Sequence, residues 1–142
     1  MSFEATVYLN LSKIEPQWLD DSVEVDKATG AVSSTTHHIP AKAREACSYR
    51  LGNQKYIERC RQEIERAVKG RAFGVPILLG KVLAEEAASG AVIPLKEVAG
   101  LKRELKSLEQ VPKLSADVKE LIFRLTRLVQ AAEENRNPIV LS

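Results

Sequence analysis

The stretch Phe3-Glu4-Ala5-Thr6-Val7-Tyr8-Leu9-Asn10-Leu11 decides the fold class of this chain. Its apolar side chains share one face of an extended backbone: Phe3, Ala5, Val7, Leu9 and Leu11. This period-two alternation predicts a β-strand with one buried face. Residues 22–25 and 31–36 read as two shorter strands, and the Asp26-Lys27-Ala28-Thr29-Gly30 segment between them is typical of a hairpin turn. We therefore expect residues 1–36 to form a three-stranded antiparallel meander.

The hydrophobic period changes to 3.6 after Pro40, which indicates helices up to residue 135. Start and stop residues divide this part into five predicted helices: 41–51 ended by Gly52, 53–70 capped by Asn53, 76–90 opened by Pro76, 95–111 ended by Pro112, and 115–135 capped by Ser115. The last helix has the fullest apolar face, so we expect it at the centre of the core. The apolar end of the chain, 138–141, is expected to add a strand to the N-terminal sheet.

Together these patterns predict an α+β fold in a single domain, residues 1–142. A small antiparallel sheet, with three N-terminal strands and the C-terminal fourth at 138–141, would pack against the helical part, 40–135. The apolar share of 44% and the charged share of 28% suit a globular domain rather than a disordered chain.

The N-terminus has no basic start followed by an apolar run, so no leader is predicted. The most apolar stretch, 73–83, is interrupted by Gly74, Pro76 and Gly80 and is shorter than the roughly 20 residues that a bilayer needs. We therefore expect a cytoplasmic protein with no membrane partner. Cys47 and Cys60 are then expected as thiols that fill the core.

Catalytic and metal-binding patterns are weak in this chain. His37-His38 are its only histidines, and neighbours in a strand point to opposite faces, so the pair does not form a metal site. Cys47 could pair with His37 or His38 as a nucleophile and a base, but it falls in the middle of a predicted helix, where nothing lowers its pKa. We expect no enzyme, no cofactor and no metal.

Charge is unevenly distributed along the chain. Residues 1–40 carry a net charge of −4, whereas residues 41–142 carry +6. Between residues 42 and 71, nine basic side chains stand against four acidic ones, with Tyr49 and Tyr56 available to stack on bases. The acidic residues among the arginines favour ion pairs along a solvated helix face. A small nucleic-acid-binding regulator using the helices of 42–71 is therefore the alternative function, and nucleic acid is the less favoured partner.

Four strings in residues 49–141 carry a family resemblance: Tyr49-Arg50-Leu51-Gly52-Asn53, Pro76-Ile77-Leu78-Leu79-Gly80-Lys81-Val82-Leu83, Ser89-Gly90-Ala91-Val92-Ile93-Pro94-Leu95-Lys96-Glu97-Val98, and Asn137-Pro138-Ile139-Val140-Leu141. With them the chain resembles small bacterial immunity-type proteins of polymorphic or contact-dependent toxin systems. Ala91 stands where an acidic residue is expected in that motif. The resemblance implies a small sheet followed by helices, and a function in binding and neutralising a cognate protein toxin. It assigns no binding residue.

One cluster suits a protein-binding role by its chemistry: Trp18, Asp20, Asp21, Glu24 and Asp26. Acidic patches speed association with basic partners, and aromatic anchors supply much of the energy of an interface. The alternative is a solvated turn beside a half-buried tryptophan. The exposed sheet could also pair edges in a homodimer, which the sequence leaves open.

Overall fold

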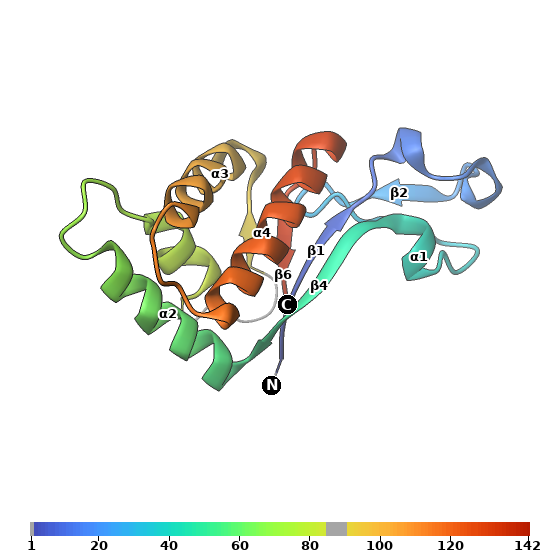
Figure 1. Cartoon of the computed structure of the whole chain (residues 1–142). Coiled ribbons are helices and arrows are strands. Elements are labelled where there is room, and N and C mark those ends of the chain that lie inside the picture. Colours follow the sequence, from blue (N-terminus) through green and yellow to red (C-terminus); the bar gives the residue numbers. More distant parts are fainter. Residues whose placement is uncertain (1, 85–90) are drawn as a thin grey trace.

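The structure, a computed structural model, describes residues 2–84 and 91–142, and its fold is α+β. The described residues form a main antiparallel sheet of four strands: β1 (Ser2–Tyr8), β4 (Glu45–Asn53), β5 (Val92–Ile93) and β6 (Ile139–Leu141). The strands lie in the order β4-β1-β6-β5 (Figure 1). The predicted fold class is confirmed. The predicted C-terminal strand is confirmed too, because Ala5 pairs with Leu141 and Thr6 with Val140.

The three-stranded meander predicted for residues 1–36 is wrong. The short strands β2 (Val23–Val25) and β3 (Val32–Ser34) pair with each other in a separate small hairpin. Its turn is where the sequence predicted it, with Gly30 at a φ of 79°. Each of these strands has only three residues, and Val25 is 44% exposed, so they offer little apolar surface to bury against helices. The longer β4 takes their place beside β1.

The helix predicted for residues 41–51 is also wrong beyond its first turn. A short helix, α1 (Ala41–Arg44), leads directly into the nine-residue strand β4. Glutamate and alanine at positions 45 and 46 favour a helix, but the next residues alternate between a half-buried or buried set and an exposed set, as a strand requires: Cys47, Tyr49 and Leu51 against Ser48 and Arg50. Pairing with β1 overrides the local helix propensity.

The remaining helices follow the predicted pattern, and their bounds are α2 (Gln54–Val68), α3 (Leu95–Glu109) and α4 (Ala116–Asn135). Both predicted side-chain caps are confirmed. The Asn53 side chain accepts the N–H of Tyr56 at 2.9 Å, and the Ser115 hydroxyl accepts the N–H of Val118 at 3.2 Å. These bonds satisfy backbone donors that a helix start otherwise leaves unpaired.

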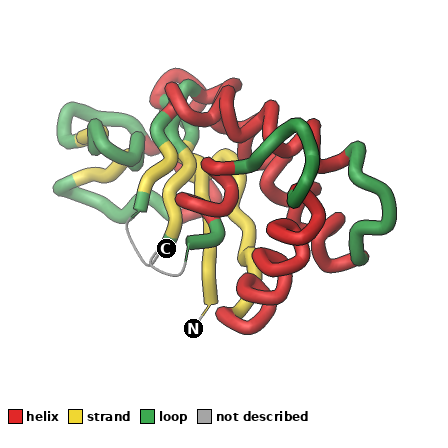
Figure 2. The backbone as a smooth tube through the Cα atoms, turned by 90° about the vertical axis from the view of Figure 1, so that its left-hand side faces the viewer, coloured by secondary structure: helices red, strands yellow, loops and turns green. Residues whose placement is uncertain are grey.

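The helices α2, α3 and α4 cover one face of the main sheet (Figures 1 and 2). As predicted, α4 is central to the core: it is 20 residues long and packs on α3 as well as on β1 and β4. Its buried apolar residues are Val118, Leu121, Ile122, Leu125, Leu128, Val129, Ala131 and Ala132. The opposite face of the sheet presents polar side chains, including the exposed Glu4, Ser48 and Arg50.

The helix predicted for residues 76–90 begins as expected and continues as the π-helical turn η3 (Leu78–Val82), but it already ends there, with Leu83 as its C-cap, so the predicted length is wrong. The predicted stop at Ser89-Gly90 lies outside the described residues. A buried carboxylate from α3 holds its beginning. Glu104 is 8% exposed, and its two oxygens accept the N–H groups of Ile77 at 3.1 Å and Leu78 at 2.9 Å. A negative charge at a helix start is favourable because the N–H dipoles point toward it.

We predict that Glu104→Ala lowers the free energy of unfolding by about 3 kcal/mol, because the buried N–H of Leu78 and the part-buried N–H of Ile77 both lose a charged acceptor. Urea unfolding followed by circular dichroism would measure the change. Glu109→Ala is the matched control, since Glu109 is exposed near the end of the same helix and its removal should change stability by less than about 0.5 kcal/mol. Equal effects of the two substitutions would contradict the role assigned to Glu104.

Candidate partner-binding site

Between β1 and β4 the chain leaves the main sheet and forms a small lobe, residues 9–40, that projects from one end of the molecule (Figure 1). The lobe contains two 3-10 turns, η1 (Leu11–Lys13) and η2 (Pro16–Trp18), and the β2–β3 hairpin. It has a small core of its own, made of Ile14, Val32 and Ile39. Trp18 is half-buried and packs against this core, so it contributes to the internal packing of the lobe.

Asparagine side chains tie the lobe to the C-terminal end of α4. Asn135 is 3% exposed; its side-chain oxygen accepts the N–H of Asn10 at 3.0 Å, and the Asn10 amide donates to the Asn135 carbonyl at 3.1 Å. The Asn137 amide donates to the carbonyl of Tyr8 at 2.8 Å, where β1 ends. A side chain at Gly30 would collide with the Asn137 amide, so this turn needs glycine for its space as well as for its positive φ.

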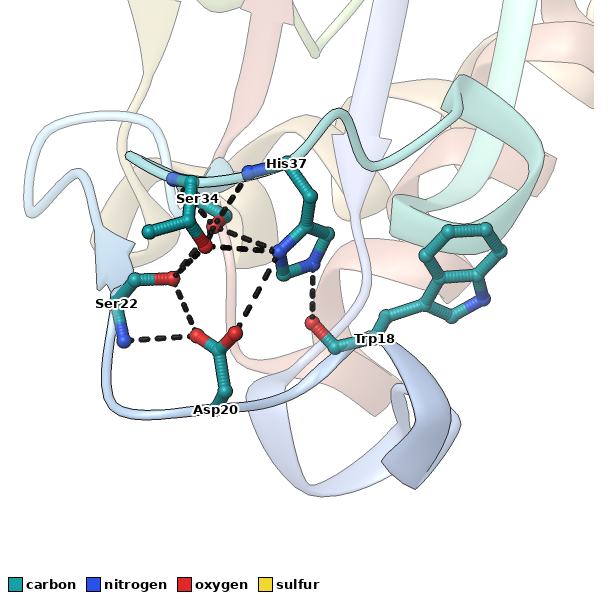
Figure 3. A network of polar contacts seen from close by, with 6 residues as sticks. Trp18, Asp20, Ser22, Ser34 and His37 are labelled. Carbon is teal, nitrogen blue, oxygen red and sulfur yellow. Dashed lines mark hydrogen bonds and ion pairs between the residues drawn. The ribbon is translucent and has the colours of Figure 1, made fainter.

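A polar network closes the open end of the β2–β3 hairpin (Figure 3). It consists of Asp20, Ser22, Ser34, Thr36 and His37. The Asp20 carboxylate accepts the N–H of Ser22 at 2.8 Å and also its hydroxyl. The Ser22 and Ser34 hydroxyl oxygens are 2.6 Å apart, and Ser34 Oγ accepts the N–H groups of Thr36 at 3.1 Å and His37 at 3.3 Å. Side chains thus link both strands of the hairpin to the loop before it.

The ring of His37 is held from two sides. Its Nε2 lies 3.0 Å from the carbonyl oxygen of Trp18, and the ring stacks on the indole with centroids 6.5 Å apart. A carbonyl only accepts, so Nε2 carries a proton, and Nδ1 faces Ser34 Oγ at 3.0 Å. Asp20 lies on the same side, 3.5 Å from Nδ1. In a catalytic triad the carboxylate and the hydroxyl contact opposite ring nitrogens. The present geometry therefore suits a structural histidine that links the hairpin to the loop before it.

The residues of the predicted acidic cluster have different surroundings in the structure. Trp18 and Asp20 are brought together at His37. Asp26 accepts the N–H of Ala28 at 2.8 Å, which builds the hairpin turn. The side chains of Asp21 and Glu24 are exposed and make no hydrogen bond or ion pair within the described parts of the chain. Two of the four carboxylates thus shape the lobe, and two are free to meet a partner.

Hydrogen bonds from the Ser22 hydroxyl and N–H lower the pKa of Asp20 below its ordinary value of 3.8. The carboxylate is therefore ionised at neutral pH and adds a fixed negative charge to the lobe. Sequence reasoning missed the partners Ser22, Ser34 and Thr36. The hydroxyl-rich run Ser33-Ser34-Thr35-Thr36 before the histidines was the signal available, because such side chains bond to nearby backbone groups in turns.

The cysteines lie in surroundings that keep them as thiols. Cys47 is in β4, not in a helix, and burial raises its pKa. Cys60 is 2% exposed, and burial raises its pKa to about 11. The remaining histidine, His38, is exposed and makes no hydrogen bond with a described residue, so the structure does not bring Cys47 and a histidine together as a nucleophile and a base.

The basic segment 42–71 is divided among α1, β4 and α2, so a strand replaces most of the first of the two helices that were predicted for it. Several of its arginines contact the protein itself. Arg44 lies over the ring of Tyr8 at 5.7 Å, and Arg61 is 3.3 Å from Glu65. On α2 the basic side chains alternate with exposed glutamates, which reduces the positive potential that a phosphate backbone would meet.

Within residues 2–84 and 91–142, no group of three or more His, Cys, Asp and Glu side chains could hold a metal ion. In that same part of the chain, no helix combines the length and the apolar character needed to cross a membrane. Comparisons with protein families, curated proteins and solved structures found no match. The lobe therefore has to be judged by its own chemistry.

We predict that Asn135→Ala loosens the lobe before it loosens the helices, with a loss of about 2 kcal/mol of stability from the broken buried hydrogen bonds. Trp18 is the only tryptophan, so its fluorescence reports on the lobe while circular dichroism reports on the helices. In urea, the fluorescence midpoint should fall more than the helical midpoint. Gln130→Ala, an exposed change on the same helix, should leave both midpoints in place. A fluorescence midpoint that does not move in Asn135→Ala would contradict the role of this amide.

We also predict a pH-dependent effect of Asp20→Asn. The folded protein holds the pKa of Asp20 below that of the unfolded chain, so the stabilisation exists above the unfolded pKa and disappears as pH falls through the folded pKa. The difference in urea midpoint between the wild type and Asp20→Asn should be present near pH 6 and shrink progressively as the pH falls below 3.8, the ordinary pKa of an aspartate. Asp21→Asn is the control, and its difference should stay small throughout. A pH-independent difference for Asp20→Asn would refute this linkage.

Proposed function

We propose that this chain is a non-catalytic protein-binding module whose acidic lobe contacts a basic partner. The observation that carries the proposal is the exposure of Asp21 and Glu24 on a lobe whose backbone is held by its own core and polar network. The neighbouring Val25 is 44% exposed and adds an apolar contact between charged side chains. An interface of this kind combines a polar rim with an apolar centre.

A prearranged acidic surface favours fast and specific association. The Asx turn at Asp26 and the hydrogen bonds of Asp20 hold the loops, so little backbone ordering is needed when a partner binds. Opposite potentials raise the association rate, and like charges exclude other partners. Trp18 supports this surface from beneath by packing on the core of the lobe.

The resemblance to immunity-type proteins suggests which kind of partner this is. We propose that it is a cognate bacterial toxin with a basic active-site region, as a nuclease has, and that the lobe covers that region in the cytoplasm. The lobe, residues 9–40, carries five acidic side chains and two lysines, a net charge of −3, which supports this pairing by charge complementarity.

The test is a pull-down from native cell extract with the whole tagged chain as bait. We expect one stoichiometric partner with a toxin-like domain. We also expect the double variant Asp21→Lys/Glu24→Lys to weaken its binding by about tenfold or more, chiefly through a slower association rate. These two residues are chosen because their side chains make no internal bond in the described structure.

The matched control is Glu58→Lys/Glu109→Lys, which makes the same charge change on α2 and α3, away from the lobe. Its affinity for the partner should stay within about twofold of the wild type, because distant rim charges change binding little. Loss of binding in the control alone would place the contact on the helices. Recovery of nucleic acid, released by salt, would support the alternative that uses residues 42–71.

A further inference from the structure

The strand β4 forms one rim of the main sheet (Figure 1). Within the described residues it pairs only with β1, and at nine residues it is much longer than β5 at the opposite rim, which has two. An edge strand carries backbone N–H and C=O groups that can pair with another chain. The position and length of β4 therefore raise the question of which of its groups are free.

The register shows which backbone groups of β4 point away from the sheet. Glu4 exchanges both of its backbone hydrogen bonds with Ser142, each at 2.9 Å, so its N–H and C=O point toward β6. Arg50 lies opposite Glu4 on β4, and antiparallel pairing then turns the Arg50 backbone outward. Ser48 lies opposite Thr6 with no register shift between the two pairs, so its backbone points outward too.

All but one of these outward backbone groups lack a hydrogen-bond partner within the described residues. The Arg50 carbonyl accepts a hydrogen bond from Nη1 of Arg124 at 2.6 Å. The N–H and C=O of Ser48 and the N–H of Arg50 have no partner in the described part of the chain. Arg124 also pairs with Glu120 at 3.1 Å, so it would keep a partner if another donor took the Arg50 carbonyl. The edge can therefore accept an added strand at low energetic cost.

The charges along this edge indicate which kind of strand fits. Three arginines bring positive charge to it: the exposed Arg50, Arg124 on α4, and Arg127, whose charge opposes the rise in the pKa of Cys47. Glu120 pairs with Arg124 and Glu4 lies opposite Arg50 on β1, so three arginines stand against two glutamates around Ser48 and Arg50. A second copy on this edge would bring another set of the same arginines close to these, and like charges repel.

We propose that the free edge of β4 binds an extended acidic segment of another protein as an added strand. Register shifts after Phe3 and after Val7 bound the regular part of the β1–β4 ladder, so the added strand is short and centred on Ser48 and Arg50. Backbone hydrogen bonds would give the affinity, and acidic side chains beside the arginines would give the preference. This surface is separate from the acidic lobe and opposite to it in charge.

The probe for the test is a synthetic peptide of about seven residues that alternates glutamate with valine and threonine, a pattern that favours an extended strand. Amide hydrogen exchange, followed by NMR on the whole chain, should show about tenfold or greater protection at Ser48 and Arg50 when the peptide is present. The amides of Cys47 and Tyr49 already face β1 and should not change. Protection should weaken as salt rises.

Two variants and three controls decide the result. Ser48→Pro removes an outward N–H and should abolish the protection at the amide of Arg50. Arg50→Glu reverses the charge without altering the backbone and should abolish the protection at the amides of residues 48 and 50. Arg59→Glu, an exposed change on α2, should leave it unchanged. The same peptide with lysine in place of glutamate should not bind. Asp21→Lys/Glu24→Lys should bind the acidic peptide normally, which separates this surface from the lobe.

The proposal is overturned if the acidic peptide gives no protection at Ser48 and Arg50, or if the lysine peptide protects them equally. It is also overturned if these amides become protected with rising protein concentration and no peptide, because the occupant would then be a second copy of the chain.

Discussion

The structure depends on the central position of β1, whose backbone bonds alternate between two neighbours. Glu4 and Thr6 face β6, and Ala5 and Val7 face β4. A buried central strand needs partners on both edges, because unpaired backbone groups are costly in a core. The N-terminus is therefore stable only when residues 45–53 and the last residues of the chain have both reached it.

This constraint accounts for the lobe. The chain leaves β1 at Tyr8 and returns as β4 at Glu45, so the intervening residues must form a unit that begins and ends at the same rim of the sheet. Asn135 and Asn137 lie where α4 turns into β6, beside the exit of β1, and their amides bond the start of the lobe and the end of β1. Correct pairing of β6 thus also positions the lobe.

The two proposed binding surfaces follow from the same arrangement. The lobe concentrates acidic residues away from the helices, whereas the rim at β4 lies beside α4 and its arginines. A chain with a net charge of only +2 thereby presents surfaces of opposite sign at different places. Such separation lets one small protein meet partners of different charge, or two parts of one partner, without competition between them.

The sequence by itself determined the features that depend on neighbours along the chain. The strand from Phe3, the turn at Gly30, the caps Asn53 and Ser115, and the helix 115–135 at the core all follow from local periodicity and hydrogen bonds of short range. The strand ends earlier than predicted, and Leu11 is 42% exposed, because the chain turns into the lobe at Asn10.

Only the tertiary structure decided the partner of β1, the strand at residues 45–53 and the place of His37. The pairing of β1 with β4 joins residues such as Thr6 and Ser48, which are 42 positions apart. The hydrogen bonds that tie the lobe to α4 join Asn10 and Asn135, which are 125 positions apart. Local patterns predicted a helix over 41–51, and from residue 45 onward pairing with β1 outweighed that preference. The acidic residues were visible in the sequence, but which of them are free depends on contacts that form only when the lobe folds, since Asp20 meets His37 across the hairpin.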